Sequence, residues 1–323
     1  MNYKKRAALL IITIASLCGV TVWGVARLRY HALRTTADWL QRLPTRDSVV
    51  FYIDFGALRK AGVLQMLAGS KVAEEPEYKV FVMKTEFDYT RDLDAVLACF
   101  TPHAKYLVAK GRFDWNSLAS YAREQGGTCR DAFCRMSGST PERKISFFPL
   151  RPNLMGLAVG PDESAATDLQ STAARRRELE LPDAPVWISI PPALLKTGGD
   201  LPPGTRMFAH TMEEADDVSI AMAPSGGRFE ARLNVECRSE QQAAALAAQL
   251  QAITAMLREM IAREHQTPNP RDLSGVLTSG TFNHLGVRVL GSWPLEKGFI
   301  EGLLGGGESD FEGPGPAHST NPR

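Results

Sequence analysis

The sequence predicts an α+β protein with two tandem related modules, each an antiparallel-rich sheet with helices packed on it, after one N-terminal transmembrane helix. Three observations lead to this prediction: an uncharged apolar run near the start, strand-like and helix-like segments in alternation, and one repeat of their order. The expected division is transmembrane anchor or signal segment 1–26, helical stalk 27–42, first module 43–180, second module 181–304 and disordered tail 305–323.

The anchor prediction depends on residues 7–26, which follow the basic residues Lys4, Lys5 and Arg6. These twenty residues carry no charge, and a helix of this length crosses the hydrocarbon layer of a bilayer. We therefore expect the lipid bilayer to be a partner of the chain. A cleaved signal peptide is the alternative, because small residues at 24 and 26 suit a cleavage site, but the apolar run is longer than the usual signal core of about 7–15 residues.

A lone N-terminal anchor before a long chain usually delivers that chain across the membrane. The predicted location is therefore the inner (cell) membrane, single-pass, with the soluble body on the extracytoplasmic side. The composition, 44% apolar and 23% charged, is that of a globular protein. The net charge is only +1, so the body offers no electrostatic attraction for nucleic acid, which we do not expect as a partner.

The first module should begin with a buried strand, because residues 49–53 are β-branched or aromatic. Helices should follow near Gly56 and from Pro76, and Asp114 should cap a third helix that ends at Gly126. The remaining elements expected here are strands at 95–100, 105–110, 145–150 and 154–159, and a helix at 162–172.

Two cysteines lie between the third helix and the last strand pair. Cys129 and Cys134 have a spacing at which two short antiparallel strands bring their side chains together, so a local disulfide is expected, with free thiols as the alternative. A zinc site would need a second pair of ligands. Cys99 and Cys237 lie in apolar strand patterns and should act as small hydrophobic residues.

The second module repeats this order. Residues 186–198 align with residues 50–62, and both segments read as a buried strand that turns into a short helix. In residues 228–237 apolar and polar residues alternate, which predicts a strand with one core face and one solvent face. The other elements expected are a strand at 218–223, a helix from Ser239 to Glu264, strands at 277–282 and 285–290, and a helix at 294–304.

The long helix carries an apolar seam at spacings of four and three. The seam favours packing on the module's own sheet, with a coiled coil as the alternative. Its members are Leu246, Leu250, Ile253, Leu257 and Met260.

The sequence contains none of the catalytic, cofactor-binding or metal-binding motifs that we sought, so no residue is assigned to such a role. Lys196, Thr197 and Gly198 resemble the KTG triplet of penicillin-recognising enzymes, but no Ser-x-x-Lys supplies a nucleophile. Two acidic groups precede the hairpins and lack the glycine and final glutamate of a calcium loop, so we interpret them as structural. They are Asp88, Asp92 and Asp94, and Glu213, Glu214, Asp216 and Asp217.

Three motifs carry a resemblance to known sequences: Leu-Pro followed by Val-Val-Phe-Tyr-Ile-Asp at 43–54, Phe-Asp-Tyr-x-Arg-Asp-Leu-Asp at 87–94, and Gly-Arg-Phe-Asp at 111–114. With them the chain resembles, over about residues 43–300, a group of uncharacterised membrane-anchored bacterial envelope proteins known only as a domain of unknown function. The resemblance implies an envelope setting and a duplicated α+β fold, and it assigns no catalytic residue.

The function that we expect is a non-catalytic binding or envelope-assembly module that contacts an envelope protein or lipid. The alternative is an extracytoplasmic hydrolase whose site is assembled from distant residues. A concave pocket with two or more convergent titratable groups would favour the hydrolase, and an exposed apolar groove or sheet edge would favour the binding module.

Overall fold

The computed structural model describes residues 33–64, 76–138, 140, 142–173, 179–196, 203–225, 228–296 and 298–300. The predicted anchor at 7–26, the first part of the stalk and the predicted tail at 305–323 lie outside these residues. Within the described ranges, no helix combines the length and the apolar character that crossing a membrane requires. Contacts between residues divide the chain into two compact units, which we describe separately.

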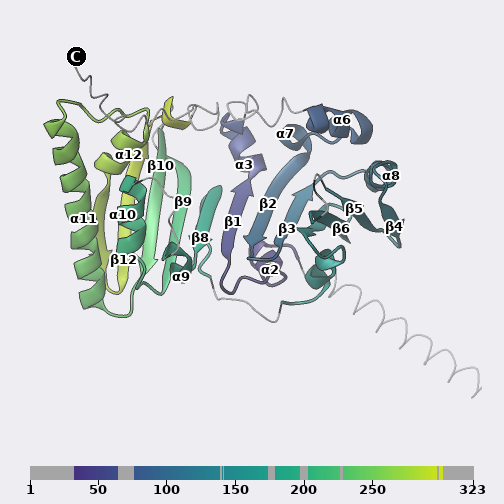
Figure 1. The fold of residues 1–323 in the computed structure, drawn as a ribbon, viewed down its shortest axis with the longest axis horizontal. Helices are drawn as coiled ribbons and strands as arrows, with labels where there is room; N and C mark the ends of the chain where they lie inside the picture. Colours follow the sequence, from purple (N-terminus) through teal and green to yellow (C-terminus); the bar gives the residue numbers. More distant parts are fainter. Residues whose placement is uncertain are drawn as a thin grey trace, which may run out of the picture. The chain divides into compact units, whose positions relative to one another are not determined.

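Unit 1 comprises the chain up to Ile53 together with residues 95–183. Its strands lie in the order β1-β2-β3-β7-β6-β5-β4, and the pairs from β3 onward along this order are antiparallel. Helix α8 packs beside β4 and β5, and the 3₁₀ helix η1 packs beside β6 and β7 (Figure 1). The bounds are α2 Thr36–Leu40, β1 Val49–Asp54, β2 Leu93–Phe100, β3 Lys105–Gly111, α8 Trp115–Glu124, β4 Thr128–Arg130, β5 Phe133–Ser137, β6 Lys144–Arg151, β7 Leu154–Gly160 and η1 Ala165–Gln170.

Unit 2 comprises residues 54–94 and 184–323. Its strands lie in the order β8-β9-β10-β12-β11, all antiparallel to their neighbours, and α10, α11 and α12 lie on one face of them (Figure 1). The bounds are α3 Phe55–Lys60, α6 Pro76–Thr85, α7 Tyr89–Asp92, β8 Val186–Ile190, α9 Pro192–Leu195, α10 Pro203–Thr211, β9 Asp217–Ser225, β10 Arg228–Glu236, α11 Glu240–Arg263, α12 Leu273–Ser279, β11 Thr281–Leu285 and β12 Arg288–Leu295.

This arrangement confirms the predicted mixture of helices and a large antiparallel sheet. The two units differ from the predicted modules 43–180 and 181–304, each of which is continuous in sequence. Residues 54–94 belong to unit 2 together with residues 184–323, whereas the strands that flank them in sequence belong to unit 1.

The core of unit 2 lies between the sheet and α11. In β10, Ala231, Leu233 and Val235 are buried, as the alternating pattern predicts, and they pack in one cluster with Leu246 and Leu250 of α11. The predicted seam therefore packs on the unit's own sheet.

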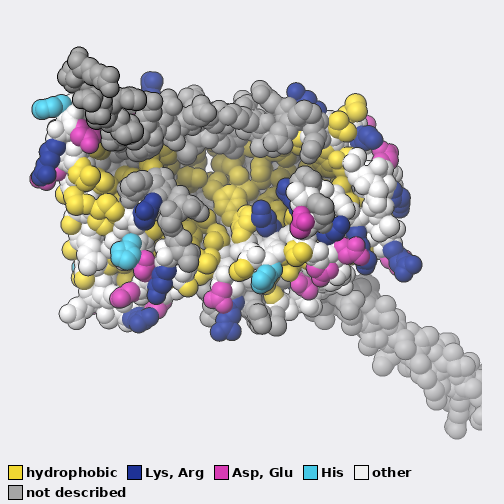
Figure 2. Space-filling view, in the orientation of Figure 1, with side chains coloured by type: hydrophobic (Ala, Val, Ile, Leu, Met, Phe, Trp, Pro, Cys, Tyr) yellow, Lys and Arg dark blue, Asp and Glu magenta, His cyan; other side chains and the backbone are white. Residues whose placement is uncertain are grey.

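The seam leaves the core towards the C-terminal end of α11. Met260, its last member, is 50% exposed, and Met256, which lies outside the seam, is 40% exposed. Figure 2 shows hydrophobic side chains at the surface along this helix. The helix begins as predicted, since Ser239 is its N-cap and accepts a hydrogen bond from the backbone N–H of Gln242.

The last elements of unit 2 differ from the prediction. Residues 277–279, predicted as strand, belong to α12, because the Asp272 carboxylate caps that helix by accepting from the N–H of Ser274 at 2.8 Å. The hairpin turn falls at Gly286, where φ is +58°, a conformation that glycine adopts without strain. Residues 294 and 295, predicted as helix, extend β12 instead. In unit 1 the helix predicted at 162–172 is the shorter 3₁₀ helix η1.

Candidate ligand-binding site

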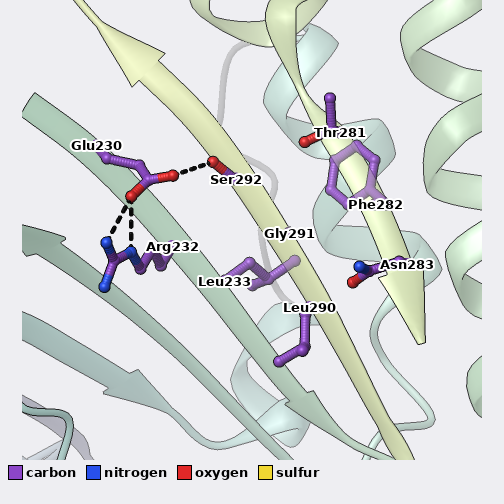
Figure 3. A pocket seen from close by; sticks show the side chains of 9 residues that line it. All are labelled: Glu230, Arg232, Leu233, Thr281, Phe282, Asn283, Leu290, Gly291 and Ser292. Carbon is purple, nitrogen blue, oxygen red and sulfur yellow. Dashed lines mark hydrogen bonds and ion pairs between the residues drawn. The ribbon is translucent and has the colours of Figure 1, made fainter. Parts of the chain in front are cut away.

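The candidate site is a hollow on unit 2 that opens on the face of β10, β12 and β11 opposite the helices (Figure 3). Its volume is about 330 Å³, at the small end of the roughly 300–1,000 Å³ of small-molecule pockets. Nine residues line it: Glu230, Arg232, Leu233, Thr281, Phe282, Asn283, Leu290, Gly291 and Ser292.

The register of the three strands brings the polar side chains of this hollow together. Arg232 of β10 pairs with Ser292 of β12, which pairs with Thr281 of β11, so these three residues form one row across the sheet. Leu290 pairs with Asn283 in the next row on the same face. Because side chains alternate along a strand, the core residue Leu233 lies on the other face and closes the floor.

Glu230 and Arg232 form a fixed ion pair at one side of the hollow. Glu230 Oε2 accepts from Nε and Nη2 of Arg232, both at 2.7 Å, and Glu230 Oε1 accepts from the Ser292 hydroxyl at 2.6 Å. The bonds from Ser292 and Arg232 hold the pKa of Glu230 below its usual range. The carboxylate therefore stays ionised except in acid.

The other side of the hollow presents groups that suit a ligand. Thr281 and Asn283 are exposed, and Leu290 is an exposed apolar residue beside them. Between the two strands, Gly291 lies opposite Phe282 and leaves room for its ring. The hollow thus offers hydroxyl and amide groups next to an apolar surface.

This chemistry suits binding better than proton transfer. A general acid near neutral pH needs a raised carboxyl pKa, and the pKa of Glu230 is lowered. A carboxylate with a low pKa is also a weak base, so it activates the neighbouring Ser292 hydroxyl poorly as a nucleophile. The ion pair instead fixes the side chains in place.

Three aspartates from the motifs at 43–54, 87–94 and 111–114 cap helices. Asp54 accepts from the N–H of Ala57 at 2.7 Å, Asp88 caps α7, and Asp114 caps α8 as predicted. Their role in the structure is to begin helices.

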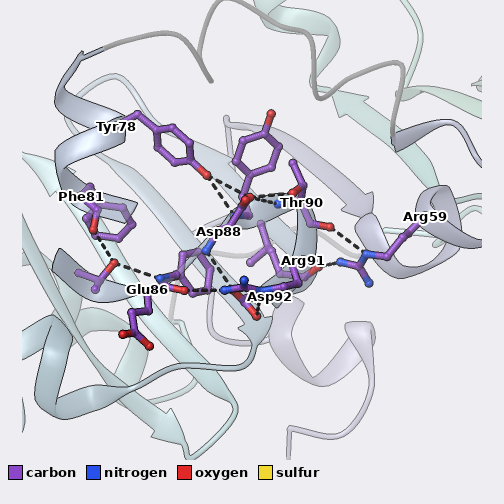
Figure 4. A network of polar contacts seen from close by, with 12 residues as sticks. Arg59, Tyr78, Phe81, Glu86, Asp88, Thr90, Arg91 and Asp92 are labelled. Atoms are coloured by element: carbon purple, nitrogen blue, oxygen red, sulfur yellow. Dashed lines mark hydrogen bonds and ion pairs between the residues drawn. The ribbon is translucent and has the colours of Figure 1, made fainter. Parts of the chain in front are cut away.

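The first acidic group lies in a polar network in unit 2 (Figure 4). Asp88 accepts hydrogen bonds from the Tyr78 hydroxyl, at 3.3 Å, and from the N–H of Thr90, at 2.9 Å. Asp92 accepts from the N–H of Asp88 at 3.0 Å and from Nη2 of Arg91 at 2.8 Å. Burial raises the pKa of Tyr78 to about 12. These carboxylates are engaged by protein donors and hold α6 and α7 together.

The second acidic group is also engaged. Glu213 lies 2.6 Å from Nδ1 of His210, and Asp216 lies 3.3 Å from Nε of Arg238. Among the described residues, no group of three or more His, Cys, Asp or Glu side chains is placed to hold a metal ion. The carboxylates named from the two acidic groups bond to protein donors in the segments that precede β2 and β9.

The cysteines occupy the positions that the sequence indicated. Cys129 and Cys134 lie opposite each other in the β4–β5 hairpin and form a disulfide, with their Cα atoms 4.1 Å apart. Cys99 and Cys237 are buried free thiols. Lys196, the first residue of the KTG triplet, is the C-cap of α9, and the other two residues lie outside the described part.

Sequence reasoning did not single out the residues of the hollow. The alternation in β10 placed Glu230 and Arg232 on the solvent face, which the structure confirms. Their meeting with Ser292 depends on the pairing of β10 with β12, about sixty residues further along the chain. No local pattern carries that information.

The chain was compared with protein families, curated proteins and solved structures, and only solved structures match it. No protein-family model matches the chain, and no curated protein matches it. Among solved structures, crystal form IV of TP0453 has 11% sequence identity, covers 82% of this chain and 95% of that chain, and gives a TM-score of 0.49. Crystal forms III and I of TP0453 give TM-scores of 0.48 at 11% and 12% identity, and cover 81% and 82% of this chain and 95% and 96% of theirs.

Proposed function

We propose that the protein is a membrane-anchored extracytoplasmic binding module without catalytic activity, and that the hollow on β10, β12 and β11 is its ligand site. The observation that carries the proposal is the Glu230–Arg232–Ser292 group, in which a carboxylate of lowered pKa is locked beside exposed hydrogen-bonding residues. Such a group orients a ligand without exchanging protons with it.

Two features support the location. The uncharged run at 7–26 has the length of a membrane span. The disulfide between Cys129 and Cys134 is of a kind that persists in oxidising compartments outside the cytoplasm. Together they favour a body held at the outer side of the inner membrane, among envelope proteins and lipids.

We also propose that residues 43–180 and 181–304 derive from one duplicated α+β module, as in the group of envelope proteins that the sequence resembles. The strand order supports this proposal, because β1-β2-β3-β7-β6 of unit 1 corresponds one for one to β8-β9-β10-β12-β11 of unit 2. In both units the helix after the central hairpin is followed by the strands that complete the sheet.

The test uses the full chain with a C-terminal tag. In intact spheroplasts the tag should be accessible to added protease and should sediment with membranes; a tag in the cytosolic fraction would refute the location. The purified chain in nanodiscs should bind polar small molecules saturably, as followed by ligand-observed NMR, and should not turn them over. If the chain hydrolyses a substrate in a broad hydrolase screen and Glu230→Gln abolishes that activity, the protein is a hydrolase and the proposal of a non-catalytic binding module is wrong.

A further inference from the structure

The charges of the hollow decide which ligands it can accept. Glu230 and Arg232 cancel each other, so the hollow has no net charge. A charged ligand of either sign would meet one like and one opposite charge, so it would gain little net attraction while losing hydration. A ligand without charge avoids that loss.

The hydrogen-bonding groups favour a ligand that both donates and accepts. Arg232 bonds to Glu230 through Nε and Nη2, so these two groups are occupied by the ion pair. The Thr281 hydroxyl and the Asn283 amide each donate and accept. Thr281 and Asn283 lie two residues apart on β11, so their side chains lie on the same face of the strand.

An apolar surface lies within the same set of groups. Leu290 is 37% exposed and pairs directly with Asn283, so its side chain is a neighbour of the amide on the same face. A sugar ring has hydroxyls around its rim and C–H groups on its faces, and it could therefore stack on Leu290 while its hydroxyls reach Thr281 and Asn283.

We infer that the hollow binds a neutral saccharide of one or two rings, an inference that rests on the proposed binding function. The volume of about 330 Å³ fits a ligand of this size. Because the hollow is shallow and open, we expect millimolar affinity.

The experiment titrates the full chain in nanodiscs with two matched pairs of disaccharides, followed by ligand-observed NMR. N,N′-diacetylchitobiose is compared with its cationic parent chitobiose, and cellobiose with its anionic uronic acid. The neutral member of at least one pair should bind more tightly than its charged analogue. Thr281→Ala and Asn283→Ala should each weaken that binding about fivefold, the loss expected for one hydrogen bond.

Thr128→Ala is the matched control, because Thr128 is an exposed threonine on the edge strand β4 of unit 1. It should leave the affinity unchanged. Tighter binding of both charged disaccharides, or neutral binding unaffected by Thr281→Ala and Asn283→Ala, would overturn the saccharide inference. Other polar ligands that bind and respond to these substitutions would leave the proposed function standing, whereas a hollow that binds no ligand would remove both.

Discussion

Adding one methyl group at Gly291 should destabilise unit 2, because the ring of Phe282 occupies the space that a side chain would need. An ideal Cβ at Gly291 would lie 2.9 Å from Cδ1 and Cε1 of Phe282 and 3.1 Å from Cβ of Leu233. Carbon atoms in good contact are about 3.5–4.0 Å apart, so the ring would have to withdraw by about 0.6 Å or more. The prediction concerns Gly291→Ala.

The ring of Phe282 has little room to withdraw. Its centroid lies 5.2 Å from that of Trp293, at an interplanar angle of 82°, and 5.9 Å from that of Phe208. Overpacking of this kind costs about 1–3 kcal/mol. Replacing glycine by alanine returns about 0.4–1 kcal/mol by restricting the unfolded chain. From the middle of each range, the net loss in the free energy of unfolding should be about 1.3 kcal/mol.

For a unit of this size the loss corresponds to a fall in Tm of about 2–8 °C. Circular dichroism and tryptophan fluorescence would follow thermal unfolding of the full chain, with Trp293 as a probe close to the change. Phe282→Leu should relieve the clash, so the double variant with Gly291→Ala should be more stable than additivity of the two single variants predicts. Strict additivity, or a Gly291→Ala variant as stable as the wild type, would refute the reasoning.

Three further predictions concern the disulfide and two titrating groups. Replacing Cys129 and Cys134 together by alanine should lower the free energy of unfolding in urea by about 2 kcal/mol, the entropy of closing so short a loop, and a reducing agent should give the same loss in the wild type. Tyr106→Phe removes a 2.9 Å hydrogen bond to Asp168 and should lower the free energy of unfolding by about 1–2 kcal/mol at pH 7. Burial, and then that hydrogen bond, raises the pKa of Tyr106 to about 12. The difference in stability between the wild type and Tyr106→Phe should therefore vanish as the pH rises from about 10 to 12. Hydrogen bonds from Ser292 and Arg232 lower the pKa of Glu230, so Glu230→Gln should be less stable than the wild type at pH 7. This difference in stability should be lost as the pH falls below about 4.5. A difference that persists in acid would contradict the role of the ionised Glu230 carboxylate.

The parts of the fold that sequence predicts well are those with a strong period or a specific cap. The alternation in β10 identified its core face, and Ser239 and Asp114 identified the starts of α11 and α8. Residues 277–282, Leu-Thr-Ser-Gly-Thr-Phe, carry no clear hydrophobic period, so their pattern distinguishes a strand from a helix poorly. Here the cap at Asp272 decides for the helix, and this signal was available in the sequence.

The candidate site is less predictable, because it depends on register. A polar residue on the solvent face of a strand is ordinary, and the sequence does not say which residue of another strand lies beside it. Glu230 contacts Ser292 only because β12 lies between β10 and β11 in the sheet, next to β10. The lowered pKa of Glu230 follows from that pairing and could not be inferred before it.

The relation between glycine and phenylalanine in unit 2 recurs in unit 1, which bears on the proposed duplication. Gly156 of β7 lies opposite Phe148 of β6 and Val108 of β3, as Gly291 of β12 lies opposite Phe282 of β11. At Gly156 an ideal Cβ would lie 3.1 Å from Cε1 of Phe148, so alanine there should cost less than at Gly291 while showing the same relief when the phenylalanine is reduced to leucine. The two glycines lie on strands that correspond in the shared order, which is the observation that supports the proposed duplication. A shared response to alanine and leucine would show that the two glycine–phenylalanine pairs pack in the same way.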